Sequence, residues 1–182
     1  VCINHELNDI SSLYQIIDYR SIYNLFDSIS IEFYDAKHIP GSASILVTYI
    51  LNGKEESIYF SGDVGSGIDN ILQGMPDNPT NVDYVFIEST YGGYTRELSD
   101  NPFHEFYNTI NKSINNSELI WIPSFVLDRT QKILNQIKIG YDKGYIDNIP
   151  PIYILSSSAK EINKVYSKHY DFKTGSEIET FS

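Results

Sequence analysis

The chain has 182 residues, with 13 Lys and Arg against 24 Asp and Glu, so its formal net charge is −11. Hydrophobic residues make up 41% and aromatic residues 14% of it, an ordinary globular composition that excludes long disordered or collagen-like tracts. The acidic balance argues against non-specific adhesion to nucleic acid, but it is compatible with a local basic or metal-bearing cleft.

The length suggests one domain or pieces of two. A single cysteine, Cys2, excludes an intramolecular disulfide framework and a cysteine-rich zinc ribbon. No apolar run approaches the ~18 residues of a membrane span, and the first ten residues do not form a signal peptide, so we expect a soluble, cytoplasmic protein without membrane association. The chain starts at Val1 rather than Met and stops at Ser182 without a closing element, which suggests a fragment.

The first half of the chain shows mainly strand patterns. Leu13, Ile16 and Ile17 are spaced as on a short helix. Residues 29–33 alternate in polarity, as in a half-buried strand. Residues 83–90 are nearly all apolar, as in a buried strand. Asn52-Gly53 predicts a hairpin, because both residues readily adopt positive φ. Strands are therefore expected at 22–26, 29–33, 44–51, 57–63 and 83–90.

After about residue 97 the pattern changes to alternating helices and strands, which is typical of an α/β domain with a parallel sheet. Asp128 is a candidate helix cap, and Ser158 with Glu161 has the spacing of a capping box. His104 opens a helix and His169 ends one, so neither is expected in a site. Helices are expected at 103–114, after 128 and after 158, and strands at 118–123 and 151–155. A domain boundary is placed near residues 95–100.

Three expected strands end in polar residues within loops that contain glycine. His38 lies in FYDAKHIPGSAS, Asp63 in YFSGDVGSG and Glu88 in FIESTYGG. Loops at strand ends commonly carry functional sites, and glycine lets the backbone approach a ligand closely. An imidazole nitrogen and a carboxylate oxygen from neighbouring elements can together ligate a hard or borderline cation.

Each of these residues alone also has an ordinary structural interpretation. A single loop histidine such as His38 is more often hydrogen-bonded than metal-bound, and Asp63 in Ser-Gly-Asp is a common turn residue. Glu88 at the end of an apolar strand can simply cap a neighbouring group or face solvent. The order and spacing of all three residues favour a site over three coincidences.

Five colinear segments extend this pattern over roughly residues 20–170. They are AKHIPGSAS at 36–44, FSGDVG at 60–65, ESTYG at 88–92, IPSFVLDRTQK at 122–132 and IYILSSSAKEINKVYSKH at 152–169. In this order they resemble the motifs of the β-CASP group of metallo-β-lactamase-fold nucleases. That group includes bacterial exonucleases of the RNase J type and the endonuclease subunit of the eukaryotic mRNA 3′-end machinery.

The resemblance implies an α/β fold in two parts. Residues 1–97 would be part of a metallo-β-lactamase αββα sandwich, and residues 98–182 part of an inserted α/β β-CASP domain with a parallel sheet. It also implies zinc-dependent hydrolysis of RNA phosphodiester bonds, in RNA processing or decay, by the full-length parent. The expected partner is single-stranded RNA lying between the two parts, with a homodimer or membership of a processing complex as further predictions.

Roles carry over from the resemblance residue by residue. His38 corresponds to a ligand of one of two zinc ions, and Asp63 to the carboxylate that bridges both. Glu88 corresponds to the acid that supports the histidines around the site, so Asp63 and Glu88 are the catalytic candidates. Two metals about 3.5–4 Å apart can polarise a phosphodiester and generate hydroxide for in-line attack. The substrate-binding candidates are Ser89, Thr90 and Arg129, of which Arg129 either pairs with phosphate or locks the two domains together.

The chain also departs from the family pattern. Lys37 and Asp128 stand where the family usually has glycine, and Leu155-Ser156-Ser157 replaces Asp-Ser-Pro. The upstream HxHxDH motif is absent, so the chain supplies two metal ligands where each zinc needs about four. We therefore expect weak metal binding and no nuclease activity from these residues alone.

Two alternatives stay open at this point. A non-catalytic relative could keep the fold and bind RNA or a partner subunit, which Lys37 and the lost Asp-Ser-Pro favour and the retention of His38, Asp63 and Glu88 opposes. The parent could instead be a DNA-directed nuclease of the same fold. The sequence does not distinguish endonucleolytic from exonucleolytic cleavage.

Overall fold

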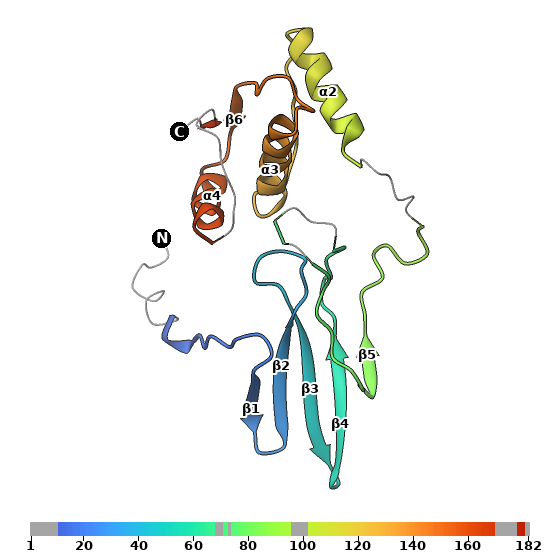
Figure 1. The fold of residues 1–182 in the computed structure, drawn as a ribbon. Coiled ribbons are helices and arrows are strands. Elements are labelled where there is room, and N and C mark those ends of the chain that lie inside the picture. The colour runs from blue at the N-terminus through green and yellow to red at the C-terminus, as the bar shows by residue number, and fades with distance from the viewer. Residues whose placement is uncertain (1–10, 68–70, 73, 96–101, 170–177, 181–182) are drawn as a thin grey trace. The chain divides into compact units, whose positions relative to one another are not determined.

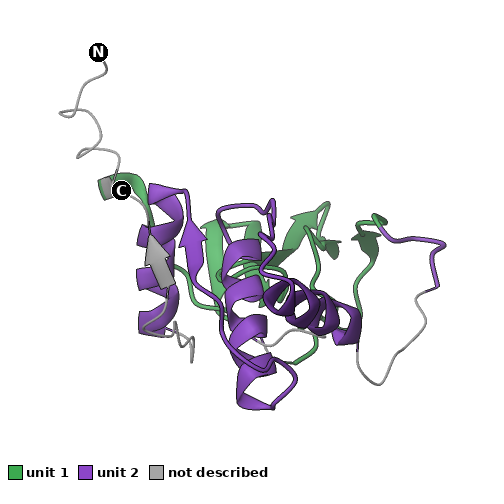
Figure 2. Ribbon diagram, turned by 90° about the horizontal axis from the view of Figure 1, so that it is seen from above, with its two compact units in different colours: residues 1–67, 74–90 green, residues 68–73, 91–182 purple. Residues whose placement is uncertain are grey.

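A computed structural model describes residues 11–67, 71–72, 74–95, 102–169 and 178–180 of the chain (Figure 1). Cys2 and His5 lie outside the described residues. The chain divides into two compact units, which Figure 2 distinguishes by colour. Unit 1 comprises Val1–Gly67 and Gly74–Thr90, and unit 2 comprises Ile68–Gln73 and Tyr91–Ser182. The domain assignment 1–97 and 98–182 stays a prediction.

Unit 1 is built on a five-stranded sheet in the order β1-β2-β3-β4-β5 (Figure 1). The first four strands run antiparallel, and β5 runs parallel to β4. Asn52 and Gly53, at φ 54° and 76°, connect β3 to β4, which confirms the predicted hairpin. The strands are β1 (Ile22–Phe26), β2 (Ile29–Asp35), β3 (Ala43–Leu51), β4 (Lys54–Phe60) and β5 (Tyr84–Phe86).

The two faces of this sheet differ in polarity. Side chains alternate between faces along a strand, so residues paired across the ladder share a face. One face carries Phe33, Ile45, Phe60 and Phe86 in a single row, and the rings of Phe60 and Phe86 stack with centroids 5.1 Å apart. Phe60 and Phe86 are 41% and 61% exposed, so this apolar face is only partly covered by the described residues.

The core of unit 1 lies under one end of the sheet. Tyr34, Ala36, Ser44, Tyr59 and Ser61 are all buried, and they cluster where β2 and β4 end and β3 begins. The rings of Tyr34 and Tyr59 meet edge to face, with centroids 6.3 Å apart. The loops that leave this end of the sheet therefore rest on its best-packed part.

Two predictions for unit 1 are wrong. The expected buried strand over 83–90 is short, covering Tyr84–Phe86, and its apolar residues are exposed, because β5 is the outermost strand of the described sheet. The helical pattern of Leu13, Ile16 and Ile17 yields only the 3-10 helix η1 (Ser11–Leu13). Ile16 is 94% exposed, so no part of the chain that the structure describes packs on it to support a longer helix.

Unit 2 contains the helices α2 (His104–Asn115), α3 (Arg129–Asp142) and α4 (Ser157–His169), which confirms the three predicted helices. β6 (Ile152–Ile154) pairs in parallel with β7 (Ile178–Thr180). Tyr107, Ile110, Ile137 and Ile146 form one buried cluster, and a second comprises Leu134, Ile154, Ala159 and Tyr166. None of the helices in the described part of the chain has the length and hydrophobicity to cross a membrane.

Two further predictions fail in unit 2. The segment 118–123 forms no strand, and Leu119 and Trp121 are each 72% exposed rather than buried. A strand needs a ladder partner, and no described strand pairs with this segment. The predicted capping box at Ser158 and Glu161 is also absent. Ser156, before the helix, accepts the Ala159 N–H at 3.3 Å instead.

We predict that Gly140→Ala destabilises unit 2. A Cβ at Gly140 would lie 2.5 Å from Tyr107 Cε1 and 2.9 Å from Ile146 Cδ1. Tyr107 cannot move freely because its hydroxyl accepts a hydrogen bond from Gln136 and its ring stacks on Tyr145. The clash should outweigh the better helix propensity of alanine and cost about 1–2 kcal/mol of unfolding free energy.

Urea unfolding of the purified chain checks this prediction. Asp142→Ala on the same helix is the control, because it removes only the exposed pair with Lys138 and should change stability by about 0.5 kcal/mol or less. A gain in stability for Gly140→Ala would contradict the packing described above.

Candidate functional site

His38 lies in the loop 36–42 between β2 and β3, which we call the His38 loop. The loop begins with a turn in which Asp35 Oδ1 accepts the Lys37 N–H at 2.9 Å and Asp35 Oδ2 pairs with Lys37 Nζ at 2.9 Å. Lys37 has φ 56°, a left-handed conformation that glycine adopts without strain. Lys37, which stands where the resembled motif has glycine, therefore binds Asp35 through both its side chain and its backbone.

Ser42 closes the His38 loop. Its Oγ accepts the N–H of His38 at 3.0 Å and the N–H of Ile39 at 3.2 Å. Its carbonyl oxygen accepts the Ala36 N–H at 3.2 Å. These bonds fix the backbone on both sides of the His38 side chain.

Asp63 follows β4 in the loop 61–67, the Asp63 loop, which approaches the His38 loop directly. His38 Nε2 and Asp63 Oδ2 lie 4.0 Å apart, and their side chains are 35% and 76% exposed. The Gly65 N–H donates to the Ala36 carbonyl at 2.8 Å. A Cβ at Gly65 would fall well inside van der Waals contact with the Lys37 carbonyl oxygen, so only glycine permits this approach.

Glu88 binds the Asp63 loop from the end of β5. Its Oε1 accepts the Val64 N–H at 2.9 Å and its Oε2 accepts the Thr90 N–H at 3.2 Å. These bonds hold the pKa of the Glu88 carboxyl below its ordinary range, the Val64 N–H most strongly, with a smaller contribution from the His38 imidazole. Because the folded-state pKa is lowered, the ionised carboxylate stabilises the fold above the ordinary glutamate pKa. That contribution disappears as the pH falls through the lowered value.

Two serines connect these loops, and sequence reasoning did not assign them a role. Ser44 Oγ donates to the Ser61 carbonyl at 2.7 Å, and Ser61 Oγ accepts the Glu88 N–H at 3.0 Å. Ser44 and Ser61 are 1% and 2% exposed. The signal that could have identified them is their place in the motif segments, since Ser44 ends GSAS in the segment that contains His38 and Ser61 begins SGD, which ends in Asp63.

The structure thus brings His38, Asp63 and Glu88 together in unit 1. Imidazole and carboxylate are donors that zinc accepts, but the described residues contain no group of three or more His, Cys, Asp or Glu side chains that could hold a metal ion. His38 and Asp63 are donor types that zinc accepts, and together they provide two of the roughly four ligands that one zinc ion needs. The metal roles of His38 and Asp63 stay predictions.

The predicted substrate-binding residues are distributed over both units. Ser89 and Thr90 are exposed in unit 1, and Thr90 is hydrogen-bonded to the Glu88 carboxylate. Arg129 is exposed at the start of α3 in unit 2. The Ser124 and Thr130 hydroxyls, which flank it, lie 2.9 Å apart.

Asp128 does not cap α3 with its side chain, contrary to the prediction. Its φ of 68° and ψ of −56°, with the Arg129 N–H donating to the Leu127 carbonyl at 2.8 Å, form a γ-turn with positive φ, which is rare and strained. The Asp128 carboxylate is buried and pairs with Lys132 Nζ at 2.7 Å. It also accepts the Tyr166 hydroxyl at 3.2 Å. Asp128, which also stands where the resembled motif has glycine, is thus held by Lys132 and Tyr166.

We predict that Gly65→Ala destabilises unit 1 much more than Gly41→Ala. Alanine at Gly65 collides with backbone atoms of the His38 loop and should cost at least about 2 kcal/mol. Gly41 has φ 80° and nothing within 4 Å of the added Cβ, so alanine there incurs only backbone strain of about 1 kcal/mol. Urea unfolding of both variants gives the comparison, and equal losses would contradict the tight loop contact.

We predict that Asp128→Asn destabilises unit 2 by about 1–3 kcal/mol, because asparagine tolerates the positive φ but loses the buried ion pair with Lys132. Lys164→Gln is the matched control, since its pair with Glu161 is exposed and should be worth well under about 1 kcal/mol. Thermal unfolding of both variants measures the difference. A neutral Asp128→Asn would show that the buried pair only offsets its own desolvation.

The chain is similar in sequence to proteins that are named as ribonucleases or as a cleavage and polyadenylation factor. The chain is 28% identical over 141 residues to Ribonuclease TTHA0252 of Thermus thermophilus, covering 78% of the chain and 31% of the relative. It is 34% identical over 142 residues to Probable RNase MJ4 of Methanocaldococcus jannaschii, covering 77% and 31%. It is 28% identical over 144 residues to Cleavage and polyadenylation specificity factor subunit 3 of Dictyostelium discoideum, covering 77% and 18%.

No family model matches the chain. The chain spans about a third of the length of the first curated relatives it matches. Their names support the resemblance to β-CASP nucleases that the motifs indicate. They also support RNA hydrolysis, in general terms, as the activity of the class to which the chain is related.

Proposed function

We propose that this chain forms part of a zinc-dependent β-CASP ribonuclease and carries one side of its metal site. The observation that supports this most directly is the approach of His38 Nε2 to Asp63 Oδ2, 4.0 Å apart, on loops that are fixed from below by buried serines. The close backbone contact between Gly65 and Lys37 holds the two loops that carry these residues together.

The three site residues take different roles in this proposal. His38 and Asp63 would hold zinc, with Asp63 in the role that the resemblance gives it, the carboxylate shared by two ions. Bound zinc would supply a hydroxide nucleophile near neutral pH and polarise the scissile phosphate. Glu88 positions the Asp63 loop by accepting the Val64 N–H, next to Asp63 in the chain. Such partners behind the ligands commonly affect metal affinity or activity by about 10- to 100-fold.

The remaining zinc ligands have to come from residues outside the described part of the chain. Each structural or catalytic zinc takes about four ligands, and His38 with Asp63 provides two. The relatives are about three times as long as the matched segment, which leaves room for further ligands. We therefore propose that the whole natural protein, rather than this chain alone, cleaves its substrate.

RNA is the proposed substrate because the relatives are named as ribonucleases or as a cleavage and polyadenylation factor. A chain with a net charge of −11 repels a polyanion in general, but dications in the site would reverse the local potential. Ser89, Thr90 and Arg129 are proposed to contact the phosphate backbone. Single-stranded RNA, a cytoplasmic location, and a homodimer or processing-complex partner stay predictions.

We predict that Asp63→Ala in the whole natural protein lowers RNA cleavage by about 100-fold or more, because loss of a bridging ligand should cost at least as much as loss of its supporting partner. Asp27→Ala, exposed in the turn between β1 and β2, is the control and should leave cleavage unchanged. The assay compares single-stranded RNA with single-stranded DNA of the same sequence, with and without zinc. The 182-residue chain alone should cleave neither.

The outcomes separate the rival functions. RNA cleavage that survives Asp63→Ala would contradict the metal mechanism. Preferential cleavage of DNA would favour the DNA-directed nuclease. The non-catalytic alternative is favoured by Leu155-Ser156-Ser157, which stands where the resembled motif has Asp-Ser-Pro. It predicts RNA or partner binding without cleavage in the whole protein, and binding that Asp63→Ala leaves intact.

A further inference from the structure

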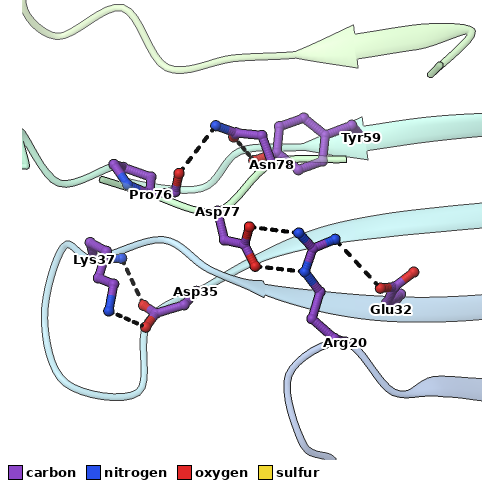
Figure 3. A network of polar contacts seen from close by, with 8 residues as sticks. All are labelled: Arg20, Glu32, Asp35, Lys37, Tyr59, Pro76, Asp77 and Asn78. Atoms are coloured by element: carbon purple, nitrogen blue, oxygen red, sulfur yellow. Dashed lines mark hydrogen bonds and ion pairs between the residues drawn. The ribbon is translucent and has the colours of Figure 1, made fainter. Parts of the chain in front are cut away.

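A group of polar contacts lies beside the His38 loop and has no role in the proposed chemistry. Arg20 donates from Nε and Nη2 to the two carboxylate oxygens of Asp77, both at 2.6 Å (Figure 3). Its guanidinium also lies 4.1 Å from the centroid of the Tyr34 ring. A two-point fork of this kind fixes the relative orientation of both side chains, which a single contact does not.

Arg20 is itself anchored to the sheet. Its N–H donates to the Phe33 carbonyl of β2 at 2.8 Å, and its φ of 62° turns the chain sharply before β1. Glu32 lies 3.9 Å from the guanidinium on the same strand. Arg20 therefore holds Asp77 at a fixed place over β2.

Asp77 links Arg20 to the residue that precedes the His38 loop. Its N–H donates to the Asp35 carbonyl at 2.9 Å, at the end of β2, and the Asp35 carboxylate holds Lys37 through backbone and side chain. Lys37 immediately precedes His38 and carries the carbonyl against which Gly65 packs. Figure 3 shows Asp77 and Asp35 side by side, with Asp77 pointing toward Arg20 and Asp35 toward Lys37.

The residue before Arg20 holds the other end of the same loop. The Tyr19 hydroxyl donates to the Ser42 carbonyl at 2.9 Å, the carbonyl that also accepts the Ala36 N–H. Tyr19 therefore contacts the end of the His38 loop directly, and the adjacent Arg20 is linked to the start of the loop through Asp77. Arg20 and Asp77 are 47% and 42% exposed, so their pair contributes little to global stability. Its effect is on local geometry.

We propose that Arg20 is a positioning residue for the candidate site: its fork with Asp77 fixes the loop that presents His38 toward Asp63. The consequence for cleavage rests on the proposed function, but the positioning itself does not. A metal ligand has to be held within about 0.5 Å of its productive place, which requires supporting contacts of this kind.

The first test measures loop order in the full 182-residue chain, without metal or RNA. Amide hydrogen exchange is followed for His38 and Gly65, whose N–H groups bond within the loop contact, and for amides in the β2–β3 ladder. Arg20→Gln and Asp77→Asn should each accelerate exchange at His38 and Gly65 by about tenfold while ladder amides change less than about twofold. The double variant should be no faster than either single variant.

Two further variants sharpen this test. Arg20→Lys keeps the charge but not the fork, so it should restore loop protection only in part. Lys54→Gln breaks another short exposed pair on the same sheet, with Glu56 at 2.6 Å, and should leave His38 and Gly65 unchanged. Uniform acceleration of all amides, or an unchanged loop in Arg20→Gln, would overturn the proposal.

The second test uses the whole natural protein. Arg20→Gln should lower kcat for RNA cleavage by about tenfold with little change in KM, because it displaces a ligand rather than a substrate contact. If the loop loosens but Asp63→Ala leaves cleavage intact, the positioning role stands and the proposed function fails. If Asp63→Ala abolishes cleavage and Arg20→Gln leaves both loop and kcat unchanged, the function stands and the positioning role fails.

Discussion

The contact on which the candidate site depends is the approach of two backbones, Gly65 against the carbonyl of Lys37. Glycine is required because no side chain fits between the loops, and the Gly65 N–H then bonds the Ala36 carbonyl at 2.8 Å. The distance between His38 and Asp63 follows from this contact. Next to it, the buried Ser44 hydroxyl donates to the carbonyl of the buried Ser61, which links the start of β3 to the residue after β4.

The chain departs from the family pattern at two glycines, and the structure gives both departures the same physical account. Lys37 and Asp128 have φ 56° and 68°, so the backbone conformation that favours glycine is kept. Each strained residue is held by an ion pair: Lys37 pairs with the Asp35 carboxylate, and Asp128 pairs with Lys132 and also accepts the neutral Tyr166 hydroxyl. The substitutions therefore preserve local geometry and do not by themselves argue for a lost function.

Sequence reasoning succeeded where structure is decided locally. The Asn52-Gly53 hairpin and the helices α2, α3 and α4 follow from turn chemistry and apolar spacing over a few residues. Sequence reasoning failed where the structure of a segment depends on residues far away in the chain. Segment 118–123 lacks a ladder partner among the described strands, and β5 was expected to be buried but is exposed. The motifs pointed to His38, Asp63 and Glu88. They did not reveal Arg20 and Asp77, which are 57 residues apart and belong to no motif.

The two carboxylates of the site differ in a way that supports their different roles. Both Glu88 oxygens are engaged by backbone N–H groups, of Val64 and Thr90, and these bonds lower its pKa. These two N–H groups hold the Glu88 carboxylate against the Asp63 loop, which suits a supporting position. Asp63 has a side chain that is 76% exposed and 4.0 Å from an imidazole nitrogen, which suits a ligand. Under the proposed function, this difference assigns the ligand role to Asp63 and the supporting role to Glu88.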